Sequence, residues 1–194
     1  MPLPSEDDTT PPDQIRSAET VARRALVLFA VVGLALGAPR DEVTAWLADN
    51  DLDGELTPRE RVFRDDPSPP RQQIVDFGWQ AERVAVLLWA LGQIAVLPLA
   101  TEQCDPGAFQ KVLPPFADMS VQAFIAAASL RPDAELWSMA DTLMDLHWQA
   151  RDAKISGHAG AKAVNLGIVQ ERHHAINWIT GYDGLAWDEV TTDT

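Results

Sequence analysis

The sequence predicts an all-α protein: an irregular, single-domain bundle of about seven to eight helices with a short ordered C-terminal tail. Several long stretches repeat apolar residues at the spacing of one helical face, whereas no stretch alternates apolar and polar residues over the length of a strand. No internal repeat is visible. With 194 residues, of which 46% are hydrophobic, the chain is long enough to bury one sizeable core.

The N-terminal part is predicted to hold a tail and two helices. Residues 1–12 are polar and proline-rich, which is typical of a disordered tail, so the helical domain is assigned to residues 13–194. A long helix is expected from Asp13 to Leu36, because its apolar residues share one face and a Gly-Ala-Pro sequence follows it. A shorter helix is expected at Arg40–Ala48.

Two further helices are predicted in the next part of the chain. A short one begins at Thr57–Glu60, which has the form of a capping box with proline at the first helical position. After a loop at Asp65–Pro70, a second long helix is expected at Arg71–Gly92. Its latter half is apolar on nearly every side, which indicates a central position in the bundle. Leu97–Pro106 is expected to be a connection.

The last part is predicted to hold four helices. Two short ones are expected within Ala108–Ala128, interrupted at Pro114–Pro115. A third long helix is predicted at Pro132–Lys154, because proline suits its first turn and the apolar spacing continues to its end. A flexible link rich in glycine and alanine follows at Ser156–Ala163. The final helix is predicted at Gly167–Ile179.

Composition and charge restrict the partners and the location. The formal net charge of −14 argues against nucleic acid or an anionic membrane as a partner, and allows basic partners or cations. The longest apolar run, Ala25–Ala38, is shorter than the roughly 20 residues of a membrane span, so it predicts a buried core helix. A single cysteine excludes an internal disulfide framework, and the acidic N-terminal residues are unlike a secretory signal. We therefore expect a soluble cytoplasmic protein.

Polar side chains interrupt the apolar faces of three long helices. At about 100° per residue, helix phase places Glu82, His147 and Arg172 among apolar neighbours, and Arg151 follows His147 by one turn. Because a charge in an apolar interior needs a partner, we predict that these four side chains meet. They could form a buried ionic network that fixes helix packing, or a pocket for a small anionic ligand. A catalytic cluster with His147 or Glu82 as general base is a third interpretation.

Residues Asp49–Glu60 match the twelve-residue calcium loop of an EF-hand, with glycine at the sharp turn. The candidate ligands stand at positions 1, 3, 5, 7, 9 and 12 of the loop: Asp49, Asp51, Asp53, Glu55, Thr57 and Glu60. An ordinary turn explains much of the pattern too, because Glu60 also completes the capping box and loops favour Asp and Gly. EF-hands normally work in pairs, and the sequence holds no second copy. Calcium binding and a plain turn both stay open.

Three weaker signals concern single positions. Glu171 and His174 have the spacing of half a di-iron carboxylate site, but the second half is missing and His174 points away from the apolar arc. Cys104 could act as a nucleophile only beside a histidine, so a plain loop thiol is favoured. Trp187 is predicted to dock the C-terminal tail and to bring acidic residues near the basic groups of the last helix.

Five segments carry a resemblance to a known family. In order they read WQAERVAVLLWALG, TEQCD, LHWQARDA, ERHHAINWI and WDEVTTDT. Together they resemble a bacterial family catalogued as domain of unknown function 4272, over about Ile15 to Thr194. The resemblance implies a compact, mostly helical protein with no established activity, cofactor or partner, so no catalytic residue is carried over. It does not imply calcium binding, because the family's version of Asp49–Glu60 lacks the three aspartates.

Several positions that match the family's motif are also those that helix phase selects. The candidate ligand-binding residues are therefore Glu82, His147, Arg151, Glu171, Arg172 and His173. The leading hypothesis is a non-enzymatic helical protein that binds a partner or a small anion at a buried charged cluster. An enzyme using Glu82, His147 and Arg172, and a calcium-binding protein using the loop, are the alternatives.

Overall fold

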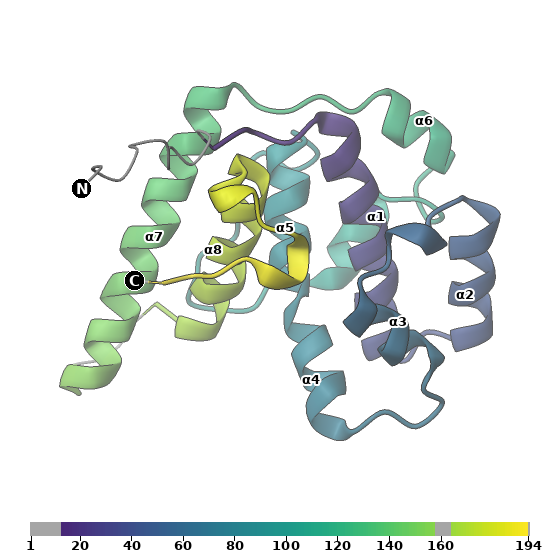
Figure 1. Ribbon diagram of the computed structural model, residues 1–194, viewed down its shortest axis with the longest axis horizontal. Coiled ribbons are helices and arrows are strands. Elements are labelled where there is room, and N and C mark those ends of the chain that lie inside the picture. The colour runs from purple at the N-terminus through teal and green to yellow at the C-terminus, as the bar shows by residue number, and fades with distance from the viewer. Residues whose placement is uncertain (1–12, 158–163, 194) are drawn as a thin grey trace, which may run out of the picture.

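The computed structural model describes residues 13–157 and 164–193 (Figure 1). Within these two ranges it contains eight α-helices, four short 3-10 helices and no strand, which confirms the all-α prediction. The α-helices are α1 (Ala18–Ala35), α2 (Arg40–Asp49), α3 (Pro58–Asp65), α4 (Arg71–Trp79), α5 (Ala81–Ala90), α6 (Val121–Ala126), α7 (Asp133–Ser156) and α8 (Leu166–Thr180). The 3-10 helices are η1 (Asp53–Glu55), η2 (Pro106–Lys111), η3 (Tyr182–Gly184) and η4 (Trp187–Glu189).

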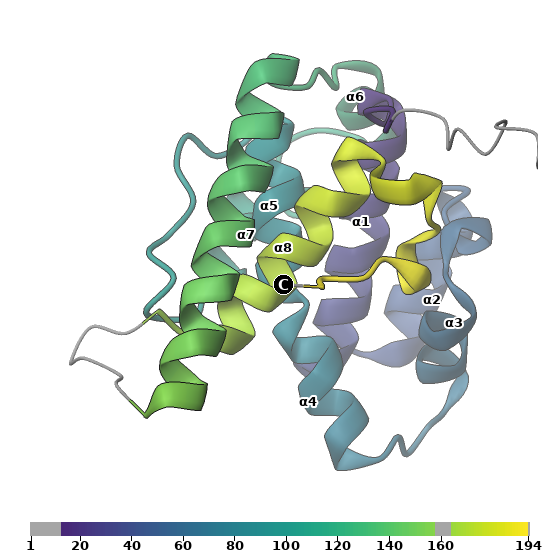
Figure 2. The same ribbon diagram turned by 60° about the vertical axis from the view of Figure 1, so that its left-hand side comes forward.

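Three helices, α1, α5 and α8, form the centre of the bundle. Helix α5 packs between α1 and α8, while α7 packs on the outer side of α8 (Figures 1 and 2). Helices α2, α3 and α4 surround α1 at the other end of the molecule (Figure 1). The apolar run predicted as a core helix forms most of α1, in which nearly every residue from Val21 to Val32 is buried. The core therefore lies mainly along α1 and α5, the two most apolar helices.

Helix α1 begins later than predicted, at Ala18 and not at Asp13. Ser17 caps it, because its hydroxyl accepts a hydrogen bond from the backbone N–H of Thr20. The preceding segment is instead bonded to the end of α8: the N–H of Arg16 donates to the carbonyl of Ile179 at 2.9 Å. The Arg16 guanidinium also donates to the carbonyls of Trp178 and Leu185. Tertiary hydrogen bonds thus replace the first helical turn.

The second long helix of the prediction is two helices. Arg71–Gly92 breaks at Gln80, whose ψ of −5° and N–H bond to Phe77 end α4 before α5 begins. Glycine at position 78 weakens the last turn of α4. The ring of Phe77 stacks on Phe63 of α3, with ring centroids 4.3 Å apart. This contact directs α4 toward α3 and away from the axis of α5.

The predicted helices in Ala108–Ala128 are shorter than expected. The first is the 3-10 helix η2, and the second is the six-residue helix α6, capped by Ser120. Between them the Pro114–Pro115 bond is cis. Two adjacent prolines supply no N–H donors, so the segment cannot continue a helix. The predicted tail at residues 1–12 lies outside the described residues, as does most of the predicted flexible link, at 158–163.

The segment after α8 folds back across α8 (Figure 2). The turn requires Gly181, which has a φ of +80° and at which a Cβ atom would lie 2.1 Å from the Gln14 carbonyl oxygen. Trp187 then inserts into the core at 5% exposure, with its ring 5.0 Å from those of Trp178 and His174. The prediction that Trp187 docks the C-terminal tail is confirmed.

Candidate functional site

Glu82 and Arg172 form a buried ion pair between α5 and α8. Their side chains are 1% and 2% exposed, and the Arg172 Nε donates to Glu82 Oε2 at 2.8 Å. Both groups also hold the connection that follows α5. Glu82 Oε1 accepts from the N–H of Cys104 at 2.7 Å, and Arg172 Nη1 donates to the Pro98 carbonyl at 2.6 Å. The pair thus acts as a brace between two helices and a loop.

The thiol of Cys104 lies against this ion pair. Burial and then the negative charge of Glu82 raise its pKa to about 12. At neutral pH the thiol therefore stays protonated, and a protonated thiol is a poor nucleophile. The geometry favours the plain-thiol interpretation over a catalytic one.

His147 and His173 form a second polar contact, between α7 and α8. Their Nδ1 atoms are 3.1 Å apart and both residues are 3% exposed. Burial and then the His147 ring lower the pKa of His173 to about 4, and burial and then Arg151 lower the pKa of His147. Both rings are therefore neutral at pH 7, so one nitrogen of the contact donates and the other accepts.

The four predicted residues are therefore divided between two centres. Arg172 and His173 are consecutive on α8, so one faces α5 and the other faces α7. Arg151 is exposed on α7 near His147, and it does not belong to the Glu82–Arg172 pair. Glu171 is part of neither centre: it forms an ion pair with Arg83 of α5.

Three carboxylates of the predicted calcium loop, those of Asp53, Glu55 and Glu60, already have basic or backbone partners. Glu60 Oε1 lies 2.5 Å from Arg24 Nη2, and its Oε2 accepts from the N–H of Thr57 at 2.9 Å, which completes the predicted capping box. Asp53 forms ion pairs with Arg61 and Arg64, and Glu55 forms an ion pair with Arg23. In the described ranges, no group of three or more His, Cys, Asp and Glu side chains is arranged to hold a metal ion. Calcium binding by Asp49, Asp51 and their neighbours stays a prediction.

A polar pocket of about 250 Å³ lies where the C-terminal segment meets α3, α4, α5 and α8. We call it the C-terminal pocket. Its lining comes from residues 59–83 and 170–192 and includes two arginines, two threonines, an aspartate and a histidine: Arg59, Arg83, Thr191, Thr192, Asp188 and His174. The predicted proximity of the acidic tail to basic groups is found here, but the basic groups are on α3 and α5 and not on the last helix.

Two buried side chains of the C-terminal pocket have polar atoms without hydrogen-bond partners. Gln80 Oε1 and His174 Nε2 are two of the four such atoms in the described part of the chain. The residues are 8% and 7% exposed. Burial and then the charge of Arg83 lower the pKa of His174 to about 2, so the ring is neutral. Buried polar atoms are normally bonded, which makes their concentration here notable.

Sequence reasoning missed most of this pocket. His174 was assigned to the side of α8 away from the core, but the C-terminal segment covers that side and buries the ring. Gln80 is buried because the chain breaks there, which periodicity within one helix does not reveal. No sequence prediction singles out Arg59 or Arg83. The one usable signal was the tail itself, in which a lone tryptophan precedes a run of hydroxyl and acidic residues.

The fold and this pocket define a helical protein whose own C-terminal segment forms one wall of a polar pocket. The chain belongs to the family described as Domain of unknown function (DUF4272), whose sequence model matches residues 2–190. This match confirms the family suggested by the resemblance. No curated protein and no solved structure matches the chain. Among the described helices, none is long and apolar enough to cross a membrane.

Proposed function

We propose that this protein binds a small polar molecule, carrying an anionic group and a hydrogen-bond donor, in the C-terminal pocket. The function is non-enzymatic binding. The observation that carries the proposal is the pair of unpartnered atoms, Gln80 Oε1 and His174 Nε2, in buried side chains of one pocket. Leaving such atoms without a partner costs about 1–3 kcal/mol each, and a bound molecule removes that cost.

The donor on the ligand follows from the protonation of His174. We assign its ring hydrogen to Nδ1, the tautomer that leaves the unpartnered Nε2 as an acceptor for a ligand. Nε2 is then an acceptor, and Gln80 Oε1 is a second acceptor. Asp188 on the rim adds a third. A molecule without a hydrogen to donate would not satisfy these groups.

The anionic group follows from the two arginines. Arg83 is held in place by its ion pair with Glu171 and by the Trp187 ring, whose centroid is 5.7 Å from its guanidinium carbon. Arg59 is exposed in the first turn of α3 and lines the same pocket. A guanidinium presents several N–H donors in a plane, which suits carboxylate and phosphate groups.

Inorganic phosphate and sulfate distinguish the two requirements. At pH 7 phosphate carries both negative charge and a P–OH hydrogen, whereas sulfate carries charge alone. We expect phosphate to raise the melting temperature saturably, by about 3–6 °C at a concentration tenfold above its Kd. Sulfate at equal ionic strength should give a smaller rise. Both salts strengthen apolar burial in general, so the difference between them is the readout.

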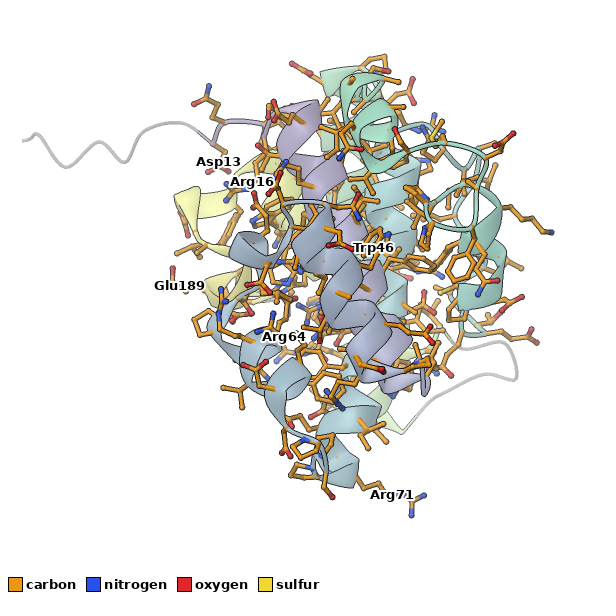
Figure 3. The ribbon with its side chains drawn as sticks, turned by 90° about the vertical axis from the view of Figure 1, so that its right-hand side faces the viewer. Asp13, Arg16, Trp46, Arg64, Arg71 and Glu189 are labelled. Atoms are coloured by element: carbon orange, nitrogen blue, oxygen red, sulfur yellow. The ribbon has the colours of Figure 1, made fainter. Side chains whose placement is uncertain are left out.

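Arg59→Gln should remove the difference between phosphate and sulfate. The matched control is Arg71→Gln, because Arg71 is exposed at the start of α4 and extends away from the body of the molecule (Figure 3). The control should keep the full difference. Equal shifts with both anions in the unmodified protein, or an unchanged phosphate response in Arg59→Gln, would contradict the proposal.

A further inference from the structure

An apolar cleft lies on the side of the molecule opposite α7, apart from the C-terminal pocket. It has a volume of about 670 Å³ and is lined by the end of α1, the start of α2 and the segment from η2 to Phe116. Small-molecule sites typically measure about 300–1,000 Å³ and are mostly apolar. The main wall residues are large: Phe29, Leu36, Val43, Trp46 and Phe116. Trp46 is labelled in Figure 3, which views this side.

The mouth of the cleft exposes more apolar surface than folding requires. Leu36 is 63% exposed and Phe116 is 60% exposed, although both also line the cleft. The Phe116 ring rests edge-on against Phe29, with centroids 6.2 Å apart, so its position is fixed on one side only. Contiguous exposed apolar residues around a concave site indicate a binding surface.

The charge in the cleft has one sign. Glu42 is the one charged side chain among the described residues that line it, and no Lys, Arg or His contributes. The carboxylate of Glu42 therefore attracts positive charge at the edge of an apolar cavity.

We propose that the cleft binds a small amphiphilic cation, a molecule with an aromatic or aliphatic body and a protonated amine. The apolar body lies between Phe29, Trp46 and Phe116, where removal from water stabilises it. The amine lies near Glu42. Faces of the aromatic walls stabilise a cation further. An anion of the same shape would meet like charge, and a neutral molecule would lose the electrostatic contribution.

Three probes of equal size test the class of ligand: 4-phenylbutylamine, 4-phenylbutanol and 4-phenylbutyrate. Calorimetric titration at pH 7 should give the amine a Kd at least tenfold lower than that of the alcohol, and the carboxylate should bind weakest. Glu42→Gln should bring the Kd of the amine close to that of the alcohol. Asp41→Asn is the matched control, because Asp41 is exposed on the same turn and does not line the cleft.

The control separates a site from general attraction to an acidic protein. If Asp41→Asn weakens amine binding as much as Glu42→Gln does, the net charge of −14 and not the cleft binds the amine, and the proposal is wrong. Equal Kd values for amine and alcohol in the unmodified protein overturn it too. A second copy of the chain is the other occupant to test. Sedimentation as a dimer that Phe116→Asp converts to monomer, without saturable amine binding, assigns the cleft to self-association and overturns the proposal.

Discussion

Among the described residues, the two most buried carboxylates are Glu60 and Glu82, each 1% exposed. Each pairs with an arginine from a distant helix, but the two are held differently. Glu60 is fixed by its own helix: it completes the capping box of α3, and Arg24 of α1 is an additional partner. Glu82 depends on tertiary contacts, because its two oxygens are taken by Arg172 and by the Cys104 N–H. One carboxylate has a local reason to be buried, and the other has none.

This difference sets the expected cost of losing each arginine. Without Arg24, Glu60 keeps its bond to the Thr57 N–H and the favourable field at the start of α3. Without Arg172, Glu82 keeps the Cys104 N–H, but the carbonyl of Pro98 also loses its donor. A buried ion pair that loses one partner leaves an uncompensated charge in the interior. The Glu82–Arg172 pair should therefore be more sensitive to the loss of its arginine than the Glu60–Arg24 pair.

The largest effect is expected for Arg172→Ala, which should reduce the free energy of unfolding by about 3–5 kcal/mol. Arg24→Ala should cost less, about 2–3 kcal/mol, because helix capping still stabilises Glu60. Urea unfolding at pH 7 measures both, with Arg71→Ala as the exposed control that should stay within about 0.5 kcal/mol. A loss below about 1 kcal/mol for Arg172→Ala, or a larger loss for Arg24→Ala, would reverse the comparison.

A fall in pH should destabilise the same two regions to different extents. The folded-state pKa of His173, about 4, is below its ordinary value of 6.5, so its contribution to stability is present above pH 6.5 and is lost as the pH falls below it. We expect a loss of about 2 kcal/mol between pH 7 and pH 5 from this residue. His174, whose pKa is lowered to about 2, adds a loss of the same sign.

Urea unfolding at pH 5, 6 and 7 tests this prediction. His173→Gln should show a shallower dependence on pH than the unmodified protein, and His147 and His174, whose pKa values are also lowered, provide the residual slope. Residues 18–65 contain no histidine, so hydrogen exchange at pH 5 should increase in α7 and α8 before it increases in α1 to α3. The same pH slope in both proteins would show that folding does not lower the pKa of His173.

Helix phase found some of the buried charged side chains and missed others. Glu82, His147 and Arg172 are buried as predicted, because a polar residue within an apolar stripe has a defined direction. Arg24 was missed because α1 is apolar on nearly every side, so helix phase does not predict which side of α1 faces the core. Periodicity also does not reveal pairing: it could not show that His147 contacts His173 and not Arg172.

The C-terminal pocket could not be predicted for a related reason. Gln80 is buried by a helix break, and His174 is buried by a segment that follows it in the sequence. Both events depend on contacts between distant residues, which one-dimensional patterns do not contain. The calcium motif shows the converse, since a local pattern predicted its helix cap correctly and left the role of its aspartates open.

The smallest effect is expected at the predicted calcium loop. To bind calcium, Glu60 would have to leave Arg24 and the α3 cap, and Asp53 would have to leave Arg61 and Arg64. Calcium must offset the loss of these partners before it can add stability. We therefore expect millimolar calcium to change the melting temperature by less than about 1 °C, since a ligand that does not bind the folded state cannot stabilise it.

Asp49→Ala provides the mutational side of this test. Asp49 is exposed at the end of α2, so its replacement should change the free energy of unfolding by less than about 0.5 kcal/mol, with or without calcium. Glu60→Gln, by contrast, should destabilise the protein without calcium, because Glu60 already stabilises α3 and neutralises Arg24. A calcium-dependent rise in melting temperature that Asp49→Ala abolishes would show instead that calcium displaces the arginines from the carboxylates of the loop. Glu60 would then be able to exchange its arginine partner for a metal ion, whereas Glu82 would keep its partners.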